Sequence, residues 1–274
     1  MKFIKVLAFS LLTWSATAQT LKVPTKSPLQ TIKQEFALSS VEIEYSRPSA
    51  RGRVIFGELE PYGKLWRTGA NAQTTITFGE DVKVNGTALK AGKYTILTVI
   101  GKDNWKIRFC TPETSVFNFK EENTVATIDS RAVELPFDIE TFTIMFGKQT
   151  DNSLEVNIMW ERTLVPFVIT TDIDAKVMAQ IDRVMTADTK PYLAAANYYY
   201  DNGKDLNKAL EWANKAVAMQ PDAFWVSHAK AKIQAKLGDK KGAIETATKS
   251  LNQAKAAGNP DYIALNERLL ATLK

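Results

Sequence analysis

Arginine and aromatic side chains are concentrated in one stretch of the sequence, residues 45–71, which reads YSRPSARGRVIFGELEPYGKLWRTGAN. The guanidinium group of arginine binds carboxylate or phosphate through two parallel hydrogen bonds, and a tryptophan or tyrosine ring stacks on a sugar or another ring. The stretch holds too many apolar side chains to be disordered in water, and long ordered loops often carry function. We therefore predict a ligand pocket lined by Arg47, Arg53, Tyr62, Trp66, Arg67 and Asn71.

A structural role is the alternative for the same stretch. In that role its aromatic side chains pack the open end of a β-structure, and its arginines form buried ion pairs with Glu42, Glu44, Glu58 or Glu60. The glycines of the stretch fit either role, because turns use glycine where other residues would be strained. The sequence leaves both roles open.

Few catalytic arrangements can be built from this sequence. His228 is the only histidine, which excludes a multi-histidine metal site and means that no Ser-His-Asp triad can be built in the β region. Cys110 is the only cysteine, which excludes an internal disulfide. No glycine-rich phosphate loop, dinucleotide fingerprint or calcium loop is present, so we predict no cofactor, no metal and no catalytic residue. Two carboxylates are enough for glycoside hydrolysis. The second hypothesis is therefore an envelope hydrolase of glycan or peptidoglycan that uses Glu58 or Glu60 with another acid.

Alternation of apolar and polar residues from residue 31 to residue 170 predicts the elements that position this stretch. Such alternation is typical of strands with one buried face. Asn85-Gly86 predicts a tight hairpin, because both central positions of a type I′ turn need positive φ. Later strands include two separate ones at residues 154–160 and 164–169. Eight to ten short strands predict an antiparallel β-sandwich or barrel.

The pattern changes at residue 171, where alanine, leucine and lysine become frequent and a helical period begins. Asp172 or Asp174 is expected to cap the first of six helices. Two later helical segments align so that Ala209 lies over Ala243, a spacing of 34 residues. This period is that of tetratricopeptide repeats. We predict that residues 171–274 form a helix-turn-helix domain that resembles degenerate tetratricopeptide repeats and contacts either a protein partner or the β domain of the same chain.

The first residues and the charge bear on where the protein acts. Residues 1–18 have the features of an export signal, with Lys2 and Lys5, a short apolar run and small residues ending at Ala18, and residues 19–30 read as a linker. No segment has the length and apolar character of a membrane span. The net charge of +5 is not concentrated in one basic patch, which argues against nucleic-acid binding. We predict a periplasmic or otherwise exported protein with no nucleic acid as partner.

Several blocks of the β region carry a family resemblance. They are YSRPSARGRVIFG, EPYGKLWRTGANAQTTITF and DVKVNGTALKAGKYTIL, followed by Trp105, FTIMF and MWERTLVPF. In order and spacing, these blocks resemble the family catalogued as domain of unknown function 2911, found in exported proteins of Gram-negative bacteria. The resemblance brings no established activity.

These observations predict a two-domain β + α protein, with an antiparallel β domain at residues 31–170 and a helical domain at 171–274. The first hypothesis for function is a non-catalytic binding or assembly protein. Its ligand, at residues 45–71, is expected to be a small anionic or carbohydrate molecule, because arginine and aromatic side chains recognise such groups.

Overall fold

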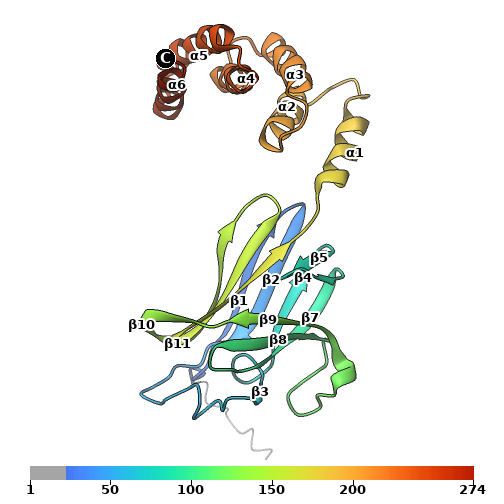
Figure 1. Cartoon of the computed structure of the whole chain (residues 1–274), viewed down its shortest axis with the longest axis vertical. Coiled ribbons are helices and arrows are strands. Elements are labelled where there is room, and N and C mark those ends of the chain that lie inside the picture. Colours follow the sequence, from blue (N-terminus) through green and yellow to red (C-terminus); the bar gives the residue numbers. More distant parts are fainter. Residues whose placement is uncertain (1–22) are drawn as a thin grey trace, which may run out of the picture. The chain divides into compact units, whose positions relative to one another are not determined.

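The computed structural model describes residues 23–274, and the chain divides into two units between Asp172 and Ile173 (Figure 1). The predicted export signal lies outside the described residues. The first unit is built of strands and the second of helices, as the sequence predicts.

The larger sheet of the β unit is antiparallel throughout, with the order β1-β2-β4-β7-β8-β9, and the short strand β3 pairs with β7. Its first strand begins two residues before the expected start of the β region. The bounds of these strands are β1 Leu29–Phe36, β2 Ser39–Ser46, β3 Leu65–Trp66, β4 Thr74–Phe78, β7 Gly92–Val99, β8 Asn104–Cys110 and β9 Thr124–Arg131. A short 3-10 helix, Glu121–Asn123, precedes β9.

The smaller sheet has the order β10-β11-β5-β6. Its strands are β5 Val82–Val84, β6 Thr87–Leu89, β10 Val133–Gln149 and β11 Ser153–Thr170. The β5–β6 turn has φ of 43° at Asn85 and 85° at Gly86, which confirms the predicted hairpin.

The prediction of two strands at residues 154–160 and 164–169 is wrong, because β11 is continuous. Its backbone is irregular at Glu161, which has φ of 48° and lies at a shift in the register with β10. A bulge of this kind bends a strand without ending it. The alternation of buried and less buried residues is interrupted at Glu161, so the sequence pattern predicts a break between two strands.

One core joins the two sheets. In β4 the burial pattern alternates residue by residue, which places one face of the strand inside. The same cluster of buried side chains contains residues of β2 and β8 from the larger sheet and of β10 and β11 from the smaller one. The strands form two separate sheets around this core, so the β-sandwich is the confirmed alternative. Its largest fully buried side chains include Trp105, Trp160, Tyr45, Phe78, Phe109, Phe142 and Phe167.

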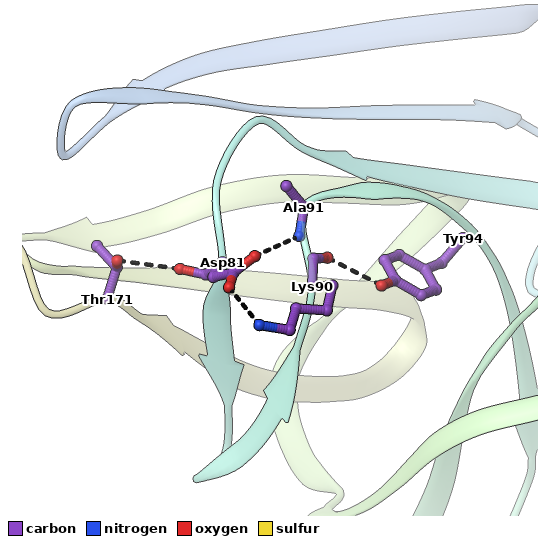
Figure 2. A network of polar contacts seen from close by, with 5 residues as sticks. All are labelled: Asp81, Lys90, Ala91, Tyr94 and Thr171. Atoms are coloured by element: carbon purple, nitrogen blue, oxygen red, sulfur yellow. Dashed lines mark hydrogen bonds and ion pairs between the residues drawn. The ribbon is translucent and has the colours of Figure 1, made fainter.

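Asp81 ties the end of the last strand to the β5–β6 hairpin (Figure 2). Its carboxylate accepts hydrogen bonds from Lys90 Nζ at 2.8 Å and from the Ala91 backbone N–H at 2.9 Å. The Asp81 carbonyl oxygen accepts one from Thr171 Oγ1 at 3.1 Å, and Tyr94 Oη donates to the Lys90 carbonyl at 2.8 Å. These bonds fix the chain where it leaves β11.

The second unit contains the six predicted helices. They are α1 Asp174–Val184, α2 Tyr192–Asp201, α3 Leu206–Met219, α4 Phe224–Leu237, α5 Lys240–Ala256 and α6 Pro260–Thr272. The predicted aspartate cap of α1 is wrong, because the N-cap residue is Ile173, which has no side-chain acceptor. Asp174 instead accepts hydrogen bonds from Tyr198 Oη at 2.9 Å and Lys204 Nζ at 2.7 Å.

From α2 to α6 each helix packs on the next one, and α4 also contacts both α2 and α6. Ala209 and Ala243, the two aligned alanines, are both fully buried. Small residues at such positions let helices approach closely. This packing is compatible with the tetratricopeptide-like repeat, which stays a prediction.

Candidate functional site

The first part of the predicted stretch, residues 45–53, lies along the outer edge of β10, and we call it the edge segment. Tyr45 is buried, and its hydroxyl both donates to the Ile144 carbonyl and accepts from the Ile144 N–H, each at 2.9 Å. Arg47 donates from Nε to the Phe142 carbonyl at 3.2 Å and from Nη2 to Thr143 Oγ1 at 3.0 Å. An unpaired strand edge presents free backbone groups, and these two side chains satisfy several of them.

The backbone of the edge segment continues the same pairing. Ser49 forms a β-bridge with Thr141, and the Ala50 N–H donates to the Glu140 carbonyl at 2.8 Å. The Phe142 N–H donates to the Pro48 carbonyl at 2.8 Å. The edge segment therefore covers β10 as a short additional strand would.

The remaining arginines of the edge segment also bind carbonyl oxygens. Arg53 donates from Nε to Ala50 at 2.9 Å and from Nη2 to Ser49 at 2.8 Å, and Arg51 Nη2 donates to Lys26 at 3.2 Å. Among the described residues, none of these arginines forms the ion pair with a glutamate that the structural alternative expected. Their role in the structure is to satisfy backbone carbonyls.

Glu161, at the bulge of β11, holds the next part of the stretch. Its carboxylate oxygens accept hydrogen bonds from the backbone N–H of Ile55 at 2.6 Å and of Phe56 at 3.3 Å. Sequence reasoning missed this residue. The available signal was the interruption of the buried alternation at a charged residue inside the block MWERTLVPF.

Trp66, a predicted stacking residue, belongs to the core. Its ring is 3% exposed and packs against four aromatic side chains, and its indole N–H donates to the Gly69 carbonyl at 3.2 Å. The ring face is therefore closed to a ligand outside the protein. The four rings are Phe56, Trp105, Phe142 and Trp160.

Directly after β3, residues 67–71 form a tight turn that brings two predicted residues together. Arg67 Nη1 donates to the Asn71 carbonyl at 2.5 Å, and Asn71 Nδ2 donates to the Ser27 carbonyl at 3.0 Å. Thr68 and Asn71 have φ of 56° and 57°. Such a conformation is strained for a β-branched residue, and strain of this kind clusters at binding sites and switch regions.

The surrounding structure holds the turn in place. Thr68 is fully buried, its hydroxyl donates to Thr98 Oγ1 at 3.2 Å, and its carbonyl accepts from Thr74 Oγ1. At Gly69, where φ is 146°, a side chain would begin 3.0 Å from the Ser46 carbonyl oxygen. The turn is therefore a rigid support for the Arg67 side chain.

Glu60 is the acidic residue next to this turn. It is half-buried, and its backbone forms a bridge with Phe56. Burial raises the pKa of its carboxyl group to about 7, against opposing effects of the Arg67 guanidinium and the Trp66 side chain. The group therefore changes charge near neutral pH, a property found often at functional sites.

Phe117 and Tyr62 are two exposed aromatic residues with a cationic neighbour. Phe117, between β8 and β9, is 83% exposed, and the Arg67 guanidinium carbon lies 5.1 Å from its ring centroid. Tyr62 is 42% exposed and has Lys102 Nζ 5.8 Å from its ring centroid. Sequence reasoning predicted Tyr62 and missed Phe117, whose only signal was an aromatic residue in a polar connection.

The structure thus divides the six predicted residues. Arg67 and Asn71 share the turn, Trp66 lies in the core beneath it, and Arg47 and Arg53 belong to the edge segment. Tyr62 contacts Lys102, and among the described residues no contact joins it to Arg67. We define the Arg67 site as Glu60, Arg67, Asn71 and Phe117.

Across residues 23–274, no group of three or more histidine, cysteine, aspartate or glutamate side chains is placed to hold a metal ion. Within the same residues, no helix has both the length and the apolar character needed to cross a membrane.

Comparison with known proteins identifies the family of the β unit. No curated protein matches the chain. A family described as "Protein of unknown function (DUF2911)" matches residues 27–169, which include every strand of the β unit except the last residue of β11. Because this match covers more than half of the chain, the protein belongs to the DUF2911 family.

Proposed function

We propose that this protein is an exported, non-catalytic binding protein that captures a small anionic molecule at the Arg67 site. The main observation behind this proposal is the number of hydrogen bonds that the Arg67 side chain makes, compared with those of Arg47 and Arg53. The side chains of Arg47 and Arg53 each make two hydrogen bonds to the protein, whereas the Arg67 side chain makes one, to the Asn71 carbonyl, among the described residues. A guanidinium group has five N–H donors, so Arg67 retains several for a ligand.

The neighbours of Arg67 define the chemistry of the ligand. A carboxylate or phosphate group fits the planar fork of a guanidinium through two parallel hydrogen bonds. Phe117 offers an exposed ring beside that fork, which suits an apolar or sugar face next to the charged group. A sugar acid, a sugar phosphate or an aromatic acid has both features.

The pKa of Glu60 adds a pH dependence to this proposal. A protonated Glu60 leaves the positive charge of Arg67 unopposed, and an ionised Glu60 repels an anion. Binding of an anion is therefore expected to strengthen as the pH falls from 8 to 6.

Isothermal titration of the full chain against glucuronate, glucose 6-phosphate and benzoate tests the proposal. We expect at least one of these molecules to bind, and Arg67→Gln to weaken its binding at least tenfold. Arg131→Gln is the matched control, because it removes the same charge from an exposed position on β9. Equal loss of binding in both variants, or no binding by any of the three molecules, counts against an anion site at Arg67.

An envelope hydrolase remains the second candidate, and one observation favours it. A carboxyl group with a pKa of about 7, such as that of Glu60, is suited to act as a general acid. Turnover of a peptidoglycan or glycan substrate that disappears in Glu60→Gln would support this candidate. A screen without turnover would count against it.

The helical unit has a proposed role of its own. We infer that it contacts another envelope protein through a repeat-like surface, and that the export signal at residues 1–18 brings the protein to the periplasm. Crosslinking in intact cells tests both statements. Crosslinks from helices α2–α6 to one envelope protein would support them, and crosslinks only to cytoplasmic proteins would contradict them.

A further inference from the structure

Helix α4 carries an unusual charge pattern for the helical unit. It contains Lys230, Lys232 and Lys236 and has no carboxylate residue. Among the described residues, none of these three lysines forms an ion pair. Ion pairs with carboxylates are formed in the same unit by Lys204, Lys208, Lys215 and Lys255.

Two of the α4 lysines converge on one aromatic ring of α2. Lys232 Nζ and Lys236 Nζ each lie 4.5 Å from the centroid of the Tyr200 ring. Lys236 Nζ also donates to the Tyr200 carbonyl at 2.9 Å. An ammonium group has three donors, so both lysines keep donors for a further partner. Two positive charges therefore lie against one ring where α2 and α4 meet.

Next to these lysines, α4 packs against α6 through buried side chains. His228 lies one turn before Lys232, and its ring meets Tyr262 edge-on at a centroid distance of 5.6 Å. Its Nδ1 is 2.8 Å from Asn266 Oδ1. Burial lowers the pKa of His228. The hydrogen bond to Asn266 raises the pKa and the positive charge of Lys232 lowers it. The imidazole is therefore neutral at pH 7. His228 therefore adds no charge beside the Lys232–Lys236 pair.

We propose that the surface formed by Tyr200, Lys232 and Lys236 binds an extended acidic peptide of a partner protein, with carboxylates at alternate positions. Because each ammonium nitrogen lies 4.5 Å from the same ring centroid, the two nitrogens are at most about 9 Å apart. Alternate residues of an extended chain point to the same side and are about 6.6 Å apart. One carboxylate therefore reaches each lysine. The inference rests on the proposed role of the helical unit in protein contacts, and adds the chemistry of the partner.

Fluorescence anisotropy with the full chain tests this proposal. The probe is a peptide in which three glutamates alternate with threonine. It carries a fluorescent label at one end and a blocking group at the other. A second peptide of the same composition places the three glutamates together. We expect the alternating peptide to bind at least fivefold more tightly than the block peptide.

Charge reversal then locates the binding surface. Lys232→Glu with Lys236→Glu is expected to weaken binding of the alternating peptide at least tenfold. The control is Lys241→Glu with Lys249→Glu, which makes the same change in net charge at exposed positions of α5. Circular dichroism melting of each variant shows whether it is folded, and Lys232→Gln with Lys236→Gln replaces the reversal if that variant does not fold.

Three results of the peptide measurements would overturn the inference. They are no binding of the alternating peptide at 1 mM, equal binding of the two peptides, and equal loss of binding in the control variant. The last two would show general electrostatic attraction. A cellular partner that still crosslinks to the helices after charge reversal would also overturn it, and would leave the proposed protein contact standing.

Discussion

The edge segment and the Arg67 site contain the same residue type within one loop, yet their arginines have different partners. Arg47 donates to a carbonyl and a hydroxyl of the edge strand β10, and Arg53 donates to two carbonyls of the edge segment itself. Arg67 follows a two-residue strand, has one such bond and lies against an exposed ring. Arginine enrichment alone therefore does not identify a binding site. Arg51 also has a single side-chain hydrogen bond, so Arg67 is distinguished by its free donors together with the neighbouring Phe117 ring and Glu60 carboxyl group.

The largest expected effect concerns Trp66, which lies beneath the Arg67 site. Trp66→Ala removes a ring that packs against four others in the core and is expected to lower the free energy of unfolding by about 3–5 kcal/mol. Urea denaturation measures this change. A loss below 1 kcal/mol would show that the ring is not part of the core.

Tyr45 gives the next largest effect, in the edge segment. Tyr45→Phe leaves both the N–H and the carbonyl of Ile144 without their partner in a buried position, at about 1–3 kcal/mol for each such group. We expect a total loss of about 2–4 kcal/mol in urea denaturation. A variant as stable as the unchanged protein would mean that water or another group replaces the hydroxyl.

Glu60 has an effect on stability that depends on pH. Its pKa is raised from 4.5 to about 7 on folding, so between these values the folded state holds a proton that the unfolded state has released. Stability contributed by this group is therefore complete below pH 4.5 and is lost as the pH rises through about 7.

Glu60→Gln keeps the neutral form at every pH. The variant is expected to match the unchanged protein at pH 4 and to exceed its stability by about 1–3 kcal/mol at pH 8, since each unit of pKa shift corresponds to about 1.4 kcal/mol. Paired urea denaturations at the two pH values measure the difference. The same gain at both pH values would contradict a titrating Glu60.

Local sequence features predicted the fold well where partners lie close along the chain. Asn85-Gly86 predicts its hairpin because the required positive φ is a property of those two residues. The five helices after α1 follow from their local pattern in the same way. The continuous β11 was not predictable, because its bulge at Glu161 is held by contacts with residues 55 and 56.

The candidate site was predicted only in part, for the same physical reason. Arg47 and Arg67 have similar surroundings in the sequence but different partners in the structure. Arg47 binds to a strand that lies about 95 residues further along the chain. Phe117 reaches Arg67 from the connection between β8 and β9, which no local pattern links to the stretch. Sequence composition located the loop, and long-range contacts assigned the role of each arginine.

The smallest expected effect on stability belongs to Arg67, and a paired measurement on Arg47→Gln and Arg67→Gln tests the division most directly. We predict that Arg47→Gln lowers the free energy of unfolding by about 1–2 kcal/mol and leaves anion binding unchanged, because its bonds to Phe142 and Thr143 are structural. Arg67→Gln is predicted to change stability by less than about 0.5 kcal/mol and to weaken anion binding at least tenfold. If Arg67→Gln destabilises the protein as much as Arg47→Gln and leaves binding unchanged, the division of the loop into a structural and a binding region is contradicted.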